Sequence, residues 1–150
     1  MNKLTEPNKN CSKCRRLYNF RKKNLSENPD WFNAPVPTFG ELSSSLLIVG
    51  LAPGLKGANK TGRPFTGDYA GDLLYKTIAK FNFSKGKYGG TIDDSLKLKD
   101  CTITNAVRCV PPQNKPISEE INNCNNFLKK TIEIHKNLKV IIALGLIAHK

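Results

Sequence analysis

The chain carries three short runs of consecutive apolar residues, each bounded by polar or turn-forming residues. Such runs are typical of strands that are buried on both faces. We therefore expect strands at residues 46–50, 101–107 and 140–145. Apolar residues at helical spacing precede and separate these runs. This spacing predicts helices at residues 11–28, 68–81 and 118–136. Strands that alternate with helices indicate an α/β protein with a parallel sheet.

A glycine-rich segment, residues 50–67, follows the first expected strand directly. Ligands of such sheets bind at the carboxyl ends of strands, and a loop of this length is uncommon unless it is functional. Its basic side chains could hold phosphates: they are Lys56, Lys60 and Arg63. From Gly54 to Thr61 the spacing is that of a nucleotide-binding P-loop, except that Asn59 stands where that motif has its second glycine. These residues are compatible both with a phosphate-binding loop and with a plain surface loop.

Charge narrows the class of partner. Lys and Arg number 24 against 12 Asp and Glu, which gives a net charge of +12. Such an excess favours polyanionic partners, nucleic acid first. No apolar run approaches the ~18 residues that span a membrane, and residues 1–9 lack the apolar stretch of a secretory signal. We expect a single domain over residues 1–150 that is cytoplasmic, associates with the nucleoid through DNA binding and has no membrane partner.

Five cysteines, an odd count without a secretory signal, argue against a disulfide framework. Cys11 and Cys14 form a C-x2-C pair. Cys109 precedes a rigid Pro-Pro turn, and Cys124 could return to it from the following helix. Four thiolates suit zinc or an iron–sulfur cluster, which spacing cannot separate, and free cysteines are also often simply buried. Cys101 lies in an apolar strand and is expected in the core.

Two segments and the cysteine set resemble the type B (family 5) uracil-DNA glycosylases, which carry an iron–sulfur cluster. Residues 50–68, GLAPGLKGANKTGRPFTGD, resemble the first motif of that family, and residues 104–112, TNAVRCVPP, resemble the second. Leu51 stands where the related family 4 enzymes have an acidic residue, which favours the type B branch. The cysteine spacing matches the ligands of the family's 4Fe–4S cluster: Cys11, Cys14, Cys109 and Cys124.

The resemblance implies a fold and an activity. The fold is the three-layer αβα arrangement of uracil-DNA glycosylases around a central parallel sheet, with three of the expected four strands present. The activity is base-excision repair: a monomeric, monofunctional enzyme flips uracil, and other deaminated bases such as hypoxanthine, out of double- or single-stranded DNA and hydrolyses the N-glycosidic bond. The alternatives are a catalytically inactive iron–sulfur DNA-binding module and, from another class, a P-loop-like nucleotide binder.

The same resemblance implies roles for individual residues. Phe65 would stack on the extruded base, and Asn105 would hydrogen-bond its Watson–Crick edge. The backbone expected to face the base and the attacking water belongs to Ala52, Pro53 and Gly54. Some members of the family have an acidic residue at the position of Asn59. Asn59 could orient the water but not deprotonate it, because an amide does not titrate near neutral pH.

The third motif of the family, a His-Pro-Ser segment near the C-terminus, does not occur in the chain. In the family, its histidine stabilises negative charge on the departing base. The two histidines here are His135, which we expect to pack on a helix, and His149. Residues 147–150 read as the start of a further helix. We therefore expect a domain that is incomplete at its C-terminus.

Overall fold

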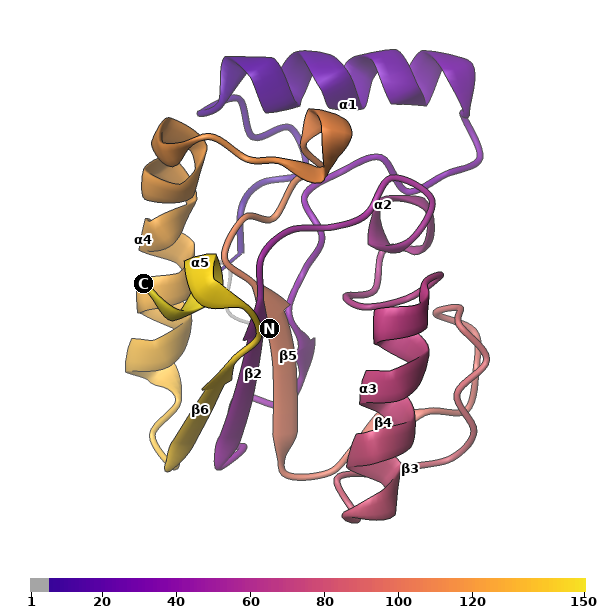
Figure 1. Cartoon of the computed structure of the whole chain (residues 1–150), viewed down its shortest axis with the longest axis vertical. Helices are drawn as coiled ribbons and strands as arrows, with labels where there is room; N and C mark the ends of the chain where they lie inside the picture. Colours follow the sequence, from indigo (N-terminus) through magenta and orange to yellow (C-terminus); the bar gives the residue numbers. More distant parts are fainter. Residues whose placement is uncertain (1–5) are drawn as a thin grey trace.

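The computed structural model describes residues 6–150, and its centre is a four-stranded sheet (Figure 1). In sheet order the strands are β1 (Phe39–Gly40), β5 (Cys101–Asn105), β2 (Leu46–Gly50) and β6 (Val140–Ala143). β2 pairs in parallel with β5 and β6, whereas β1 pairs with β5 antiparallel. The three expected strands are confirmed. The sheet is mixed rather than wholly parallel because of β1, whose two residues are too few to form a pattern.

The three long helices match the predicted segments and are α1 (Arg15–Glu27), α3 (Tyr69–Lys80) and α4 (Ser118–Ile134). A helix also begins near the expected place at the end of the chain: α5 (Leu146–His149). Besides β1, four short elements were not predicted: α2 (Ala58–Thr61), β3 (Ser84–Lys85), β4 (Lys97–Leu98) and the 3-10 helix η1 (Pro112–Asn114). Within residues 6–150, no helix combines the length and the apolar character that crossing a membrane requires.

Helices cover both faces of the sheet, α3 on one side and α4 with α5 on the other (Figure 1). Successive side chains of a strand point to opposite faces. Leu46 and Ile48 of β2 accordingly lie in the core beneath α3, and Leu47 and Val49 lie in the core beneath α4. The predicted three-layer αβα arrangement is therefore confirmed.

β6 departs from its predicted environment. Its apolar run was expected to be buried, but Val140 is 52%, Ile141 47% and Ile142 42% exposed. The reason is its place in the sheet: β6 pairs with β2 on one side, and no other described strand pairs with its outer edge. An apolar run alone does not distinguish a central strand from an edge strand.

His135 ends α4 and serves packing, as expected. Its ring is buried, with Nδ1 2.6 Å from the Thr131 carbonyl oxygen and Nε2 3.3 Å from Thr102 Oγ1. The contact with Thr102 joins the end of α4 to β5. This arrangement fixes α4 against the sheet.

Candidate functional site

The carboxyl ends of β2 and β5 lie side by side, because Gly50 and Asn105 are paired in the parallel register. The pairing continues into the two loops, where the Ala106 N–H donates to the Gly50 carbonyl oxygen (2.9 Å). A Cβ atom on Gly50 would lie 2.3 Å from Phe65 Cζ and 2.6 Å from Asn105 Oδ1. Both predicted base-binding side chains therefore meet over one backbone position, and only a glycine leaves room for them.

Phe65 enters this position through a strained backbone. Its φ is +58°, a region that side-chain-bearing residues rarely adopt and that clusters at functional sites. The ring borders an open cavity of about 580 Å³ that also touches Leu51 and Ala52, and its far wall includes Leu73 of α3 and Leu144. Ala52 borders this cavity, whereas Pro53 is buried. The wall is mainly apolar, which suits a planar ring.

The side chain of Asn105 is buried. Among the hydrogen bonds of residues 6–150, none involves its side-chain amide, while its carbonyl oxygen accepts a bond from Arg108 Nε (3.1 Å). Arg108 is itself fully buried and forms an ion pair with Glu6, with Nη1 2.6 Å from Oε2. The backbone of Asn105 is therefore held in place, and within residues 6–150 its side-chain amide forms no hydrogen bond that competes with a ligand.

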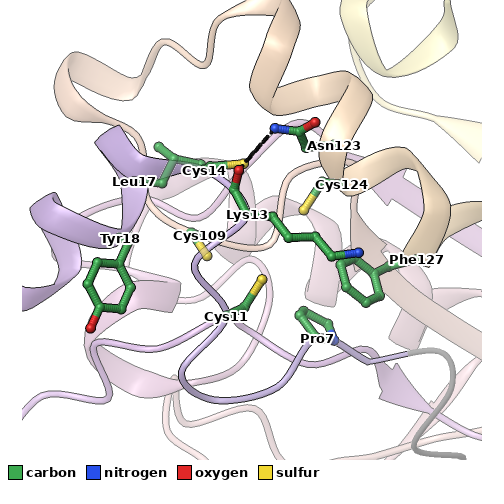
Figure 2. A pocket seen from close by; sticks show the side chains of 10 residues that line it. All are labelled: Pro7, Cys11, Lys13, Cys14, Leu17, Tyr18, Cys109, Asn123, Cys124 and Phe127. Atoms are coloured by element: carbon green, nitrogen blue, oxygen red, sulfur yellow. Dashed lines mark hydrogen bonds between the residues drawn. The ribbon is translucent and has the colours of Figure 1, made fainter.

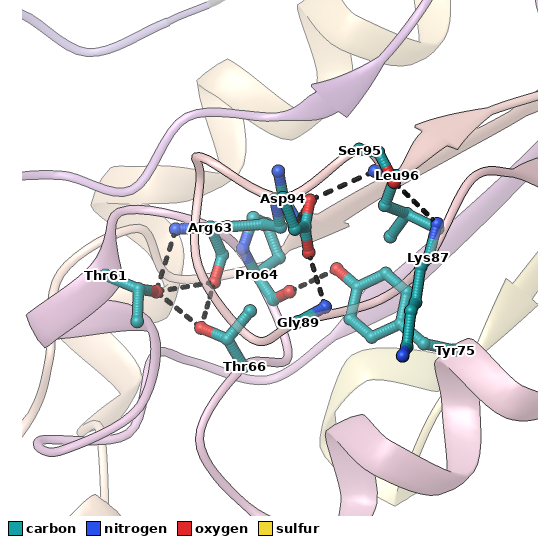
Figure 3. Close-up of polar contacts among 10 residues, drawn as sticks. All are labelled: Thr61, Arg63, Pro64, Thr66, Tyr75, Lys87, Gly89, Asp94, Ser95 and Leu96. Atoms are coloured by element: carbon teal, nitrogen blue, oxygen red, sulfur yellow. Dashed lines mark hydrogen bonds and ion pairs between the residues drawn. The ribbon is translucent and has the colours of Figure 1, made fainter.

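Arg63 was predicted to contact DNA phosphate, and the structure contradicts this. Its guanidinium is buried, with Nη1 2.8 Å from both carboxylate oxygens of Asp94 and its Cζ 4.4 Å from the centre of the Phe39 ring. Figure 3 shows the network around it, in which the Tyr75 hydroxyl donates to the Pro64 carbonyl oxygen (2.6 Å). A buried cation that already has a carboxylate partner does not reach DNA. Arg63 instead braces the loop that presents Phe65.

Asn59 was expected to face the reacting water, but the structure buries it completely. Its side-chain amide donates to Asn33 Oδ1 (3.0 Å), and its backbone N–H donates to the Gly54 carbonyl oxygen (3.1 Å). An amide enclosed in this way is not open to water arriving at the Phe65 cavity. Asn59 therefore joins the glycine-rich loop to the segment after α1.

The structure also argues against a P-loop. In a P-loop the glycine-rich segment leads directly into a long helix. Here the four-residue α2 ends at Gly62, whose φ of 85° is left-handed. Of the two other basic residues of the loop, Lys56 is exposed, and exposed Lys60 lies with its ammonium 5.7 Å from the centre of the Trp31 ring.

Four cysteines converge beneath the N-terminal end of α1 (Figure 2). One small cavity is bordered by Cys11, Cys14, Cys109 and Cys124, with Leu17, Tyr18 and Phe127 among its other walls. Two of the sulfurs accept hydrogen bonds: Cys14 from Asn123 Nδ2 (3.7 Å) and Cys124 from the Arg108 N–H (3.5 Å). The predicted set is thus brought together. Cys101 lies apart from it in the core, as expected.

Burial of these thiols affects their pKa and therefore the kind of group that they can bind. Burial raises the pKa of Cys109 to about 12, and the nearby Arg21 guanidinium opposes that rise only in part. Burial also raises the pKa of Cys14 and of Cys124. Metals bind the thiolate form, so a positively charged group between the sulfurs would have to offset this burial.

The spacing of the thiols is not that of a compact single-ion site. Among residues 6–150, no three side chains of His, Cys, Asp or Glu are grouped so that they could hold a metal ion. In a 4Fe–4S cluster, each cysteine thiolate is bound to the cluster rather than to one shared central ion. Four sulfur donors that border one apolar-walled cavity are compatible with such a cluster.

Several residues that shape the site were missed from the sequence. Asp94 and Tyr75 hold the Phe65 loop, and Glu6 and Arg108 hold the Asn105 loop. Arg108 stands inside the second motif, and its basic charge next to Cys109 was the one available signal. The other three stand in segments without a motif, so their roles follow only from the folded structure.

Comparisons with known proteins agree with this geometry. The family model described as "Uracil DNA glycosylase superfamily" matches residues 37–150. A protein of Pyrobaculum aerophilum named type-5 uracil-DNA glycosylase is 37% identical over 143 residues, which cover 93% of this chain and 63% of that protein. The type-5 uracil-DNA glycosylase of Thermus thermophilus is 39% identical over 144 residues, which cover 92% of this chain and 65% of that protein. A type-4 uracil-DNA glycosylase of Pyrobaculum aerophilum is 38% identical over 151 aligned positions, which cover 100% of this chain and 63% of that protein.

Proposed function

The chain belongs to the uracil DNA glycosylase superfamily, and we propose that it carries the base-recognition site of an enzyme that removes uracil from DNA. The chain spans a little under two thirds of the length of the type-5 relatives described above. Among the described residues, the observation that carries the proposal is the meeting of Phe65 and Asn105 above Gly50. This meeting joins a flat apolar surface to a free amide at the carboxyl ends of two parallel strands.

Recognition of the base follows from the chemistry of the two side chains. An enzyme that acts on a nucleobase must first take it out of the stack. The Phe65 ring offers a face for the extruded base, and the wall beside it is apolar. The Asn105 amide offers both a donor and an acceptor, which matches the alternating carbonyl and N–H groups of the uracil edge. Because the rest of Asn105 is held by Arg108, the amide is positioned before the base arrives.

The reaction is hydrolysis of the bond between the deoxyribose and the base. Its transition state resembles an oxocarbenium ion, as in glycoside hydrolysis, and the leaving base gains negative charge. A donor aimed at an oxygen of that base stabilises the charge as it develops, and the Nδ2 group of Asn105 is such a donor. Ala52 borders the cavity, and the proposal has the backbone from Ala52 to Gly54 face the base and the attacking water. We include neither Asn59 nor Arg63 in this chemistry. Arg63 is buried and paired with Asp94, and Asn59 is fully enclosed with its amide nitrogen bonded to Asn33.

Contacts with the DNA backbone are assigned to exposed basic residues. Lys56 and Lys60 stand on the loop that presents Phe65 and are open to solvent. Lysines placed in this way hold phosphates and set the register of the strand without reading its sequence. The excess of basic residues over the whole chain would strengthen this binding at low salt.

The four converging cysteines are proposed to hold a 4Fe–4S cluster, and its role is structural. Such a group would join the segment before α1, the loop after β5 and α4, since its ligands would be Cys11, Cys14, Cys109 and Cys124. Cys109 is four residues from Asn105 along the chain, so the cluster would stabilise the loop that follows the base-binding residue. Its chemistry there is ligation of thiolates rather than electron transfer.

An excision assay on a duplex with a single uracil tests the proposed function. The protein is expected to leave an abasic site that alkali cleaves, and Asn105→Ala is expected to lower the rate by about 10²- to 10³-fold, the usual cost of losing one such donor. Asn126→Ala, at an exposed position of α4, is the matched control and should excise normally. Thermal melts establish that both variants fold. If the wild-type protein binds DNA but releases no uracil, a catalytically inactive DNA-binding module replaces the enzyme.

A further inference from the structure

A second concave site lies between α1 and the segment that follows it, outside the Phe65 cavity. Its volume is about 190 Å³. Its walls are formed by Lys9, Arg21, Lys22, Leu25, Trp31 and Phe32, together with neighbouring small and polar residues. A water molecule occupies about 30 Å³ in the liquid, so the groove has room for one planar ring system but not for a duplex. We call it the Trp31 groove.

The side chains that line the groove carry positive and no negative charge. None of the residues that line it is Asp or Glu, and α1, which forms one wall, has five basic residues and one acidic residue. Arg21 is buried and donates to the carbonyl oxygens of Lys9 and Cys11. Among residues 6–150, its Nε atom has no acceptor and no carboxylate forms an ion pair with its guanidinium. The charge therefore favours an anionic ligand.

The aromatic wall is fixed relative to the base-recognition site. Trp31 is half-buried, and the ammonium of Lys60, from the glycine-rich loop, lies 5.7 Å from the centre of its ring. The adjoining backbone is tied to the same loop, because the Phe32 N–H donates to the Lys60 carbonyl oxygen (3.0 Å) and the Asn33 N–H to the Asn59 carbonyl oxygen (3.0 Å). In Figure 1, α1 crosses directly above α2. The Trp31 groove is therefore held against the loop that presents Phe65.

We propose that the Trp31 groove binds one unpaired nucleotide of the DNA strand, outside the site where the damaged base is held. The base stacks on Trp31, and Lys22 and Lys60 contact its phosphates. Aromatic faces combined with a basic groove are how proteins hold single strands without reading their sequence. In a duplex the faces of each base are covered by its neighbours, so only an unpaired base can stack here. The proposal rests on the proposed function only in taking DNA as the partner.

The fluorescence of Trp31 reports on this groove alone, because the chain contains one tryptophan. Titration with a short uracil-free thymidine strand is expected to quench it. A strand of equal length made of abasic sugar-phosphate units, and a duplex of equal length, are expected to leave it almost unchanged. Equal quenching by the abasic strand would mean that only phosphates bind, and that result would overturn the stacking.

Variants measured by the anisotropy of labelled single-stranded DNA give a second test. Trp31→Ala is expected to weaken binding about 5- to 150-fold, the usual effect of losing one base stack, and Trp31→Phe to restore most of it. Lys22→Glu is expected to weaken binding more than Lys80→Glu, which makes the same charge change at the far end of α3. Unchanged affinity in Trp31→Ala would refute the proposal.

Excision of uracil, measured in parallel, separates the two ideas. Quenching without excision would refute the proposed enzyme activity and support nucleotide binding in the Trp31 groove. Excision by the wild-type protein without quenching by the thymidine strand would refute nucleotide binding in the Trp31 groove and support the enzyme activity.

Discussion

Replacing Arg63 separates a bracing role from a DNA-binding role. Arg63→Met keeps much of the length of the side chain but removes the charge, so Asp94 is left with a buried carboxylate. Removing one partner of a buried ion pair typically costs about 3–5 kcal/mol. Asp94 keeps two backbone donors, the N–H groups of Gly89 (2.8 Å) and Leu96 (3.2 Å). We therefore expect a loss near the lower limit, about 3 kcal/mol in the free energy of unfolding.

Urea unfolding of four proteins measures this loss: the wild type, Arg63→Met, Asp94→Leu and the double variant. If the pair acts as described, the double variant loses clearly less than the sum of the single variants, because neither partner is left alone. A loss below about 1 kcal/mol in Arg63→Met, the range of exposed pairs, would refute the reasoning.

Lys56→Met is the matched control for the same question. Lys56 is exposed, so the substitution should change stability by no more than about 0.5 kcal/mol. It should instead lower the slope of log binding constant against log salt by about one. Arg63→Met should leave that slope unchanged. A salt slope that Arg63→Met lowers and Lys56→Met leaves unchanged would instead show that Arg63 contacts DNA phosphate.

Two further predictions concern the base-binding position and acid stability. Gly50→Ala would place a methyl group 2.3 Å from Phe65 Cζ and 2.6 Å from Asn105 Oδ1. Displacing such groups by about 1 Å can cost on the order of 10²-fold in rate, so excision should fall far more than the melting temperature; an unchanged rate would contradict the assigned pocket. Burial raises the pKa of Asp94, but hydrogen bonds from backbone N–H groups and from Arg63 lower it more, and the pKa lies below its usual value. The stability that this carboxylate contributes is therefore present above its unfolded pKa of about 3.9 and is lost as the pH falls through the lower folded pKa. Asp94→Asn should flatten the curve of unfolding free energy against pH in this range. Urea unfolding at several pH values measures that curve.

The parts of the fold that could be predicted are those that depend on local pattern. Apolar runs marked the strands, and helical spacing marked α1, α3 and α4 to within a few residues. Because parallel strands place their carboxyl ends at one edge, the motif residues Gly50 and Asn105 could be expected to meet, and they do. Both base-binding residues followed from a resemblance in motif rather than from physical pattern.

The parts that could not be predicted depend on long-range packing. An arginine in a glycine-rich loop suits a phosphate contact and a buried ion pair equally well, and its partner Asp94 is 31 residues away. The apolar run of β6 gave no sign that it would lie at the edge of the sheet, because its local composition matches that of central β2. Likewise, nothing in the sequence around Asn59 showed that its amide would be enclosed by Asn33.

The ion pairs show how a chain with twice as many basic as acidic residues uses the few acids it has. Three pairs join described residues: Arg16 with Glu120, Arg63 with Asp94 and Arg108 with Glu6. Each joins segments far apart in the sequence, and each adjoins a proposed functional element: the cysteine cavity, the Phe65 loop and the Asn105 loop. The arginines that fix the site are therefore paired internally, and DNA binding falls to lysines that are exposed. Salt should accordingly weaken DNA binding through the lysines while leaving the buried pairs of Arg63 and Arg108, and with them the shape of the site, largely unaffected.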